Sequence, residues 1–268
     1  MTAITRRTFI AAAGAAALAA ACSDDGASDA APDATSTSTS PAPSSTTATD
    51  STTTTTAASV PDPAAAEPTA LTVADFAGLG TCVLLPAAGA GPFGLEEQFV
   101  RRDITEGYPG HALRLGIRVL DADCLAVPGA AVEIWHTDAS GDYSAFEDNG
   151  NGKDEAAGTT FLRGTQIADE DGIVEFHTIY PGWYPGRTVH IHVRVRVDES
   201  LVLTSQLYLD DAYTAQVFTE PAYADNGQPD TTNATDGLAG DVATDATLVA
   251  LTAEGDGTLG LINVAVAA

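Results

Sequence analysis

The chain has 268 residues, of which 37 are Asp or Glu and 11 are Lys or Arg, so its formal net charge at pH 7 is −26. A chain this acidic repels polyanions, which excludes a role in binding nucleic acid. With only three cysteines, it also lacks the soft ligands of a thiolate metal site.

The first 21 residues are typical of an export signal. Arg6 and Arg7 precede a run of small apolar residues that is too short to anchor as an ordinary membrane-spanning helix. The stretch "TRRTFI" resembles signals of the twin-arginine type, whose pathway carries proteins that are already folded, often with a cofactor inserted. Cys22 follows three alanines and opens a polar segment, so we expect a lipidated, envelope-anchored protein. Soluble secretion after cleavage at a small-residue site is the alternative.

Residues 22–70 are rich in Ser, Thr, Ala, Pro and Asp and contain no aromatic residue. Such a segment cannot bury enough apolar area to offset the entropy lost on ordering. We therefore expect a disordered tether of about 35–40 Å that holds a domain clear of the cell envelope. Residues 71–268 have the length and apolar content of one domain with a substantial core.

Cys82 and Cys124 are the remaining pair of cysteines if Cys22 is lipidated. Outside the cytoplasm the redox environment is oxidising, so this pair predicts a disulfide. Two free, buried thiols are the alternative.

Short β-type runs recur between turn signals in the second half of the chain, whereas helical periodicity is scarce. The runs are ALRLGIRVL (112–120), AAVEIWH (130–136), GIVEFHTIY (172–180), TVHIHVRVRV (188–197), LVLTSQLYL (201–209) and TLGLINVAVA (258–267). This spacing predicts an all-β fold, an antiparallel sandwich or barrel with long loops, and we favour the sandwich. The sequence "DEDG" at 169–172 predicts a hairpin turn in which Gly172 supplies a positive φ.

The run HIHVRVRV at 190–197 has a polar and an apolar face. Side chains alternate across a strand, so His190 and His192 project in the same direction. Arg194 and Arg196 share their face, and the opposite face consists of Ile191, Val193, Val195 and Val197. The pattern alone indicates a half-buried strand with one face in water.

Several separated motifs, in order, resemble the intradiol ring-cleavage dioxygenases. They are GPF (91–93), AVEIWHTDASGDYS (131–144), FLRGTQIADEDGIVEFHTIYPGWYPGRTVHIHV (161–193) and TSQLYL (204–209). The likeness is nearest to the β-chain type of protocatechuate 3,4-dioxygenase, and a pair placed like Cys82 and Cys124 is typical of exported members. The combination is specific because several elements must agree, whereas an HxH alone is weak. The tail beyond residue 210 matches less clearly.

The resemblance implies a mononuclear non-haem Fe(III) held by Tyr143, Tyr184, His190 and His192. Phenolate is a hard anionic donor that suits Fe(III), and imidazole completes a mixed O and N ligand set. The interval from Tyr184 to His190 is shorter than in the cytoplasmic members. Each residue also has an ordinary alternative: a loop aromatic for Tyr143, a packing residue in a Pro-Gly turn for Tyr184, and polar strand residues for the histidines.

The resemblance also implies three residues with roles in the reaction. Tyr184 is expected to leave the metal and accept a substrate proton. Arg187 is expected to stabilise negative charge developing on the ring, with a surface ion pair as its alternative. Gln206 matches a polar residue near the metal, or is an ordinary polar strand residue. The following residues are predicted to be structural: Trp135 in the core, and His136 and His177 in strands or turns.

The implied activity is Fe(III)-dependent intradiol cleavage of catechol-type aromatics by O₂, giving cis,cis-muconate-type products that contain both oxygen atoms. The expected partners are a small-molecule catechol and O₂, with a membrane contacted only through a lipid anchor; the oligomeric state stays open. A non-catalytic, cell-surface β-sandwich binding module is the alternative, and a zinc or copper site is a third hypothesis. The colour of the purified protein distinguishes these three hypotheses, because only tyrosinate bound to Fe(III) is reddish.

Overall fold

The computed structural model describes residues 69–80, 82–147, 150–151, 156–239, 242 and 245–268. All of these residues belong to one compact unit. The predicted signal, Cys22 and almost all of the predicted tether lie outside the described residues, so those expectations stay predictions. Within the described ranges, no helix has the length and apolar character needed to cross a membrane.

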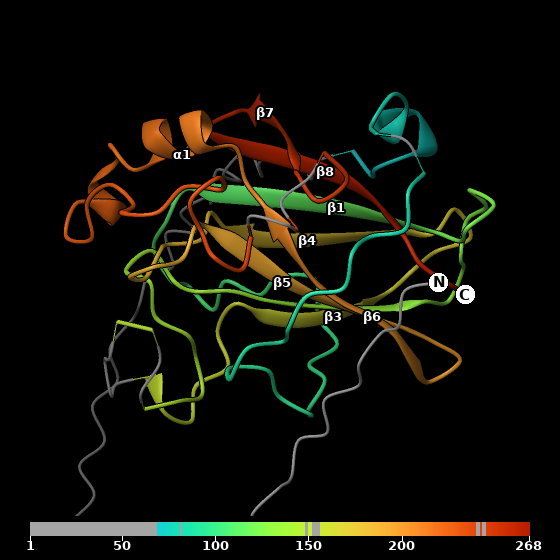
Figure 1. Ribbon diagram of the computed structural model, residues 1–268, viewed down its shortest axis with the longest axis horizontal. Coiled ribbons are helices and arrows are strands. Elements are labelled where there is room, and N and C mark those ends of the chain that lie inside the picture. Colours follow the sequence, from blue (N-terminus) through green and yellow to red (C-terminus); the bar gives the residue numbers. More distant parts are fainter. Residues whose placement is uncertain (1–68, 81, 148–149, 152–155, 240–241, 243–244) are drawn as a thin grey trace, which may run out of the picture. The chain divides into compact units, whose positions relative to one another are not determined.

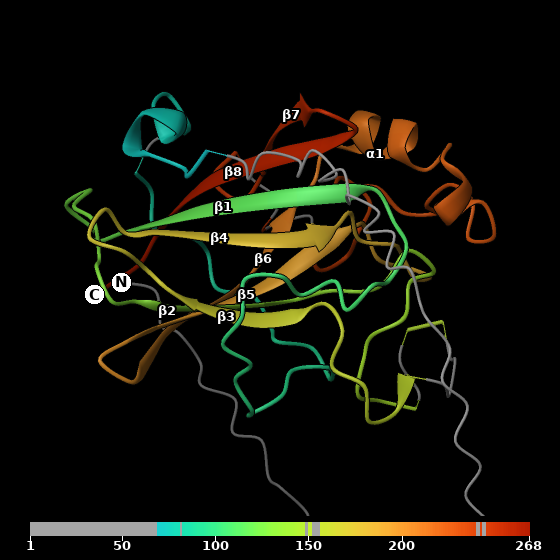
Figure 2. The same ribbon diagram turned by 180° about the vertical axis from the view of Figure 1, so that it is seen from behind.

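The domain consists of two four-stranded sheets, in the strand orders β4-β1-β8-β7 and β3-β2-β5-β6. Figures 1 and 2 show them as two layers packed face to face. The first sheet contains β1 (Ala112–Leu120), β4 (Ile173–Ile179), β7 (Ala250–Glu254) and β8 (Gly257–Ala265). The second contains β2 (Ala131–Trp135), β3 (Arg163–Ile167), β5 (His190–Val197) and β6 (Ser200–Tyr208). The predicted all-β sandwich is confirmed.

The strand pairing differs from the sequence expectation in two places. β1 pairs with β8 in parallel, while the other strand pairs of the two sheets are antiparallel. The expected hairpin at 169–172 is wrong: Gly172 does adopt a positive φ of 76°, but β3 and β4 belong to different sheets. The turn is therefore a corner between the two layers.

Helices are short and lie outside the sheets. Those among the described residues include α1 (Asp211–Val217) and the 3₁₀ turns η1 (Val73–Phe76) and η3 (Pro221–Tyr223). Asp210 caps α1 by accepting a 2.8 Å hydrogen bond from the backbone N–H of Tyr213. The Tyr213 hydroxyl is 2.6 Å from the hydroxyl of Thr258. This contact fixes α1 against the start of β8, at the end of the sheet seen in Figure 1.

The core lies between the sheets, where the apolar face of each strand meets the other layer. Ile191, Val193 and Val195 of β5 are fully buried in this core, together with β1 residues such as Leu115 and Ile117. The alternation of β5 therefore predicts its core face correctly. Its opposite face is not in water, because long loops cover it.

The thiols of Cys82 and Cys124 lie within hydrogen-bonding reach of each other, and no bond joins them in the structure. The Cys82 thiol donates to the carbonyl oxygen of Asp121 over 3.4 Å. A hydrogen bond with Cys124, and then burial, raise the pKa of the Cys82 thiol to about 11. The two thiols are thus neighbours, and the disulfide between them stays a prediction.

Candidate metal centre

Three of the four predicted ligands bring their donor atoms together on the outer face of the second sheet. The Tyr143 hydroxyl oxygen is 3.2 Å from Nε2 of His190 and 3.1 Å from Nε2 of His192. The two Nε2 atoms are 3.2 Å apart. The exposed fractions of Tyr143, His190 and His192 are 0%, 3% and 1%. The three donor atoms therefore form a small, buried triangle.

Strand β5 aims both imidazoles at this triangle, because His190 and His192 lie two residues apart on one face. Nδ1 of His190 is 2.7 Å from the backbone carbonyl oxygen of Thr188. A carbonyl oxygen only accepts hydrogen bonds, so Nδ1 carries the proton and Nε2 of the neutral ring presents a lone pair. Burial, and then the charge of Arg187, lower the pKa of His190 to about 3, which keeps the ring neutral. His190 is thus prepared to donate a lone pair to a cation.

His192 is held from the side by Trp135 of β2. The two residues are paired across the strands, and their rings stack with centroids 4.7 Å apart and planes within 2°. The guanidinium carbon of Arg194 lies 4.7 Å from the Trp135 ring centroid. Burial lowers the pKa of His192 well below 6.5, so this ring is also neutral. Trp135 is buried as predicted, but it faces the candidate site and not the inter-sheet core.

The turn before Tyr143 brings this residue to the site, and its backbone packs closely against that of Trp183. Gly141 has a φ of 88°, and a Cβ at this position would come within 1.9 Å of the Trp183 carbonyl oxygen. Only glycine satisfies both conditions. Asp138 closes the turn by accepting hydrogen bonds from the backbone N–H groups of Ser140 and Asp142 over 2.9 and 3.0 Å. The turn that carries Tyr143 therefore packs directly against the loop that carries Tyr184.

Tyr184 lies beside the triangle and is only half-buried. Its ring centroid is 5.8 Å from that of Tyr143 and 5.8 Å from that of His190. Burial first, and then the charge of Tyr184 and a hydrogen bond with its hydroxyl, raise the pKa of Tyr143. The structure therefore brings all four predicted ligands together, with Tyr184 on the more accessible side.

Arg187 and Gln206 also reach the site. Nη1 of Arg187 donates to the Tyr184 hydroxyl over 3.3 Å, and Nη2 donates to Oε1 of Gln206 over 2.5 Å. The amide nitrogen of Gln206 donates in turn to the carbonyl oxygen of Gly89 over 3.2 Å. Arg187 is consequently no surface ion pair, and Gln206 is no isolated strand residue. Both belong to one hydrogen-bonded network around Tyr184.

Two further residues at the site were not found from the sequence. The Phe93 ring stacks on the Tyr143 ring, with centroids 4.5 Å apart. Buried Arg163 donates from Nη1 to the Phe93 carbonyl oxygen over 2.7 Å and from Nε to the Ser144 hydroxyl over 2.6 Å. Arg163 thereby fastens both segments that enclose Tyr143. GPF and FLRG belong to the motifs of the resemblance, but the sequence does not indicate that these two segments contact each other.

Two histidines predicted to be structural lie away from the triangle. His136 is fully buried, and its ring nitrogens lie 2.8 Å from the Thr137 carbonyl oxygen and 2.7 Å from the Thr178 hydroxyl. Burial lowers its pKa to about 4. His177 lies on β4 in the other sheet, with Nε2 3.0 Å from Glu175. Neither contributes a donor atom to the candidate centre.

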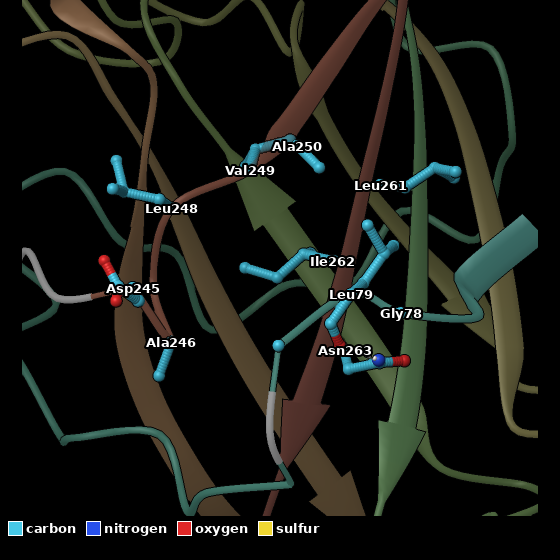
Figure 3. Close-up of a pocket in the computed structure, with 11 residues that line it drawn as sticks. Gly78, Leu79, Asp245, Ala246, Leu248, Val249, Ala250, Leu261, Ile262 and Asn263 are labelled. Carbon is cyan, nitrogen blue, oxygen red and sulfur yellow. Dashed lines mark hydrogen bonds between the residues drawn. The ribbon is translucent and has the colours of Figure 1, made fainter.

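A cavity of about 330 Å³ lies elsewhere in the domain. Its described lining includes Leu79, Val249, Ile262 and Asn263, which Figure 3 shows around the strand β8. None of the predicted ligands lines it, and neither does Arg187 or Gln206. We therefore place the candidate site at the donor triangle and not at this cavity.

The donor set fits a metal ion with hard character. Donor atoms bound about 2 Å from one ion stand roughly 3 Å apart, which agrees with the spacing of 3.1–3.2 Å. In the part of the chain that is described, no group of three His, Cys, Asp or Glu side chains could hold a metal; the donor triangle differs because a phenol oxygen supplies its third donor. Burial raises the pKa of Tyr143 well above 10, so its phenol ionises only when a cation compensates the charge. A hard, highly charged cation would supply that charge, because such ions prefer anionic oxygen ligands.

Comparison with known proteins decides the family. The family model described as "Dioxygenase" matches residues 93–228, which include all four predicted ligands. An intradiol ring-cleavage dioxygenase from Tetranychus urticae superposes with a TM-score of 0.64 and 31% sequence identity, over 69% of this chain and 95% of that one. The chain belongs to the intradiol ring-cleavage dioxygenase family. Membership agrees with the motif resemblance; its likeness to the protocatechuate β-chain type and to exported members stays a prediction.

Curated members of the intradiol family match a shorter stretch. Chlorocatechol 1,2-dioxygenase of Rhodococcus opacus is 29% identical over 121 residues, which are 38% of this chain and 45% of that protein. Catechol 1,2-dioxygenase of Acinetobacter baylyi is 32% identical over 145 residues, 47% of this chain and 44% of that protein. The chain thus spans less than half the length of these relatives.

Proposed function

We propose that this protein is a ferric intradiol dioxygenase that cleaves catechols with O₂ to cis,cis-muconate-type products. The observation that carries the proposal is the buried triangle of one phenol oxygen and two imidazole nitrogens, 3.1–3.2 Å on each side. Tyr143, His190 and His192 would hold the ion, with Tyr184 as the fourth ligand. Curated relatives named for catechol and chlorocatechol support the substrate class.

Bound ferric iron would draw electron density from a chelated catechol and so prime a ring carbon for reaction with O₂. The protein residues supply the other requirements. Tyr184 is the half-buried ligand, and its hydroxyl accepts a hydrogen bond from Arg187. As a phenolate ligand it would be able to leave the ion and take a proton from a substrate hydroxyl at its phenolate oxygen, becoming a neutral phenol.

Arg187 would stabilise negative charge that develops on the substrate. Its guanidinium is held in one orientation by Gln206 and Tyr184, so little reorganisation is needed when charge appears. Buried Tyr143, His190 and His192 keep water from the far side of the site, which strengthens this interaction. Trp135 and Thr188 fix the two imidazole planes.

Within the catechols, we propose substrates without a carboxylate group. The positive charge of Arg187 is balanced by the buried carboxylate of Asp236, 2.8 Å from its Nε. This pairing reduces the long-range attraction of Arg187 for a permanent anionic substituent, whereas its Nη groups still stabilise charge that develops beside them. The acidic chain, with a net charge of −26, adds repulsion. An envelope location, proposed on the signal and tether alone, would expose the enzyme to catechols outside the cytoplasm.

The test is turnover of catechol by iron-loaded protein in ¹⁸O₂. We expect equal consumption of catechol and O₂ and a muconate product that carries both labelled oxygen atoms. Catechol should be turned over faster than 3,4-dihydroxybenzoate. If loaded protein binds catechol but consumes no O₂, the alternative of a binding module is correct and the dioxygenase proposal fails.

A further inference from the structure

Residues 229–239 lie beyond the family match, which ends at residue 228. The sequence pattern gave them no role. In the structure they run alongside the loop that carries Tyr184 and Arg187. The side chain of Asp230 accepts a hydrogen bond from the Gly186 N–H over 3.2 Å, and the Asn233 side chain accepts one from the Thr188 hydroxyl over 2.9 Å.

Asp236 makes the most direct contact between this segment and the candidate centre. One carboxylate oxygen accepts hydrogen bonds from Nε of Arg187 over 2.8 Å and from the backbone N–H of Thr188 over 2.9 Å. The other accepts from the N–H groups of Leu238 and Ala239 over 2.7 and 3.0 Å. The Asp236 side chain has no exposed surface. A buried carboxylate that accepts four hydrogen bonds is held in a single orientation.

The two residues that Asp236 contacts both lead to the metal triangle. Arg187 donates to Tyr184 and Gln206 with its remaining nitrogens. The carbonyl oxygen of Thr188 accepts the Nδ1–H of His190, which sets the tautomer of that ligand. One carboxylate therefore fixes both the guanidinium plane and the backbone that orients an imidazole.

We propose that Asp236 is a positioning residue: it anchors Arg187 and the Thr188 backbone, so that residues 229–239 complete the active site. The carboxylate also supplies the counter-charge that lets a guanidinium remain buried beside a metal centre. Burial alone would raise the pKa of Asp236, but hydrogen bonds from Thr188 and Arg187 hold it below the ordinary value, so the carboxylate stays charged. The catalytic consequence rests on the proposed function, whereas the anchoring does not.

The anchoring is tested first in metal-free, substrate-free protein by NMR. The Nε–H signal of Arg187, assigned by its absence from Arg187→Lys, should be protected from solvent exchange in the wild type. Asp236→Asn should lose that protection, because the charged acceptor is gone. Asp210→Asn is the matched control: Asp210 lies in the same C-terminal part of the chain and caps α1, so this variant should keep the signal.

The catalytic consequence is tested with iron-loaded protein and catechol. Relative to bound iron, Asp236→Asn should lower kcat about 10–100-fold with KM near the wild-type value, the loss typical when a residue that orients a site is removed. Asp210→Asn should leave both constants unchanged. Partial unfolding of Asp236→Asn would lower bound iron and activity together, so it would leave the iron-normalised kcat unchanged.

Rapid exchange of the Arg187 Nε–H in the wild type would overturn the proposal, even if Asp236→Asn does not fold. Unchanged iron-normalised kcat in a folded Asp236→Asn protein would overturn it as well. Absence of catechol turnover in the wild type would count against the proposed function alone, because the NMR comparison still decides the anchoring.

Discussion

The outer faces of the two sheets have similar alternating sequence patterns, but their polar side chains have different partners. On β1 and β4, Arg114 and His177 both pair with the carboxylate of Glu175 over 3.0 Å. On β5, His190 and His192 direct their Nε2 atoms at the Tyr143 hydroxyl and at each other. The first face is a satisfied network of opposite charges. The second collects lone pairs that a cation would satisfy.

This difference shows that the role of a histidine is inferred best from the groups that its side chain contacts. His177 is bound by a carboxylate, is about a third exposed, and needs nothing further. His190 and His192 are buried and neutral, and their Nε2 atoms converge without an acidic partner within the described residues. Sequence alternation is the same in both places, so the contacts, and not the pattern, distinguish a structural face from a metal site.

The largest difference should appear when one histidine of each face is replaced by alanine. His192→Ala removes a proposed ligand, so bound iron and catechol turnover should both be lost. His177→Ala removes the partly exposed member of the charge network around Glu175, and losing this one contact costs up to about 1 kcal/mol of stability. It should keep iron and turnover. Metal analysis and O₂ uptake on both purified variants make the comparison; iron retained in His192→Ala would mean that the ligand set is misassigned.

Two arginines, Arg187 in the loop before β5 and Arg114 on β1, should differ by a smaller amount. Arg187→Lys should keep the iron but lower kcat about 10²-fold, because lysine cannot donate to Asp236, Tyr184 and Gln206 at once. Arg114→Lys, on the other sheet, should leave kcat unchanged. Steady-state kinetics normalised to iron decide this. Equal effects of the two substitutions would remove Arg187 from the reaction.

The charge network of the first sheet should respond to acid. Despite burial, hydrogen bonds from Arg114, Arg102 and His177 lower the pKa of Glu175 from 4.5 to about 2. In the unfolded chain this group gains its proton near pH 4.5, so its contribution to stability is present above that pH. It should be lost as the pH falls to about 2, by roughly 2–3 kcal/mol.

Urea unfolding of metal-free protein across this range measures the effect. Glu175→Gln should be less stable near neutral pH and should show a correspondingly smaller loss of stability between pH 4.5 and 2. An unchanged slope in Glu175→Gln would show that other carboxylates carry the acid sensitivity.

The fold could be predicted where periodicity is strong. The core face of β5 follows directly from its alternating valines and isoleucine. β3 and β7 were missed, because RGTQI and ALTAE lack a run of β-branched residues and β7 is an exposed edge. The burial of the polar face of β5 could not be predicted either, since the cover comes from loops remote in sequence.

The candidate site could be predicted only where residues lie in recognisable motifs. Tyr143, Tyr184, His190 and His192 do so, and the structure brings them together. Asp236 contacts Arg187, which lies 49 residues earlier in the chain, and Arg163 contacts Ser144, which lies 19 residues earlier. No sequence pattern predicts contacts between residues so far apart. Their roles depend on how loops pack, which a single sequence does not specify.

The visible absorption spectrum of iron-loaded protein tests the central claim most directly, with Tyr143→Phe compared against Tyr180→Phe. Tyr180 is also buried, but its hydroxyl meets Thr214, 2.7 Å away in another part of the domain. We expect a reddish charge-transfer band in the wild type and in Tyr180→Phe, and its marked loss in Tyr143→Phe. A wild-type protein that binds iron without such a band, or a Tyr143→Phe protein that keeps it, would contradict the assignment of a tyrosinate-bound ferric centre.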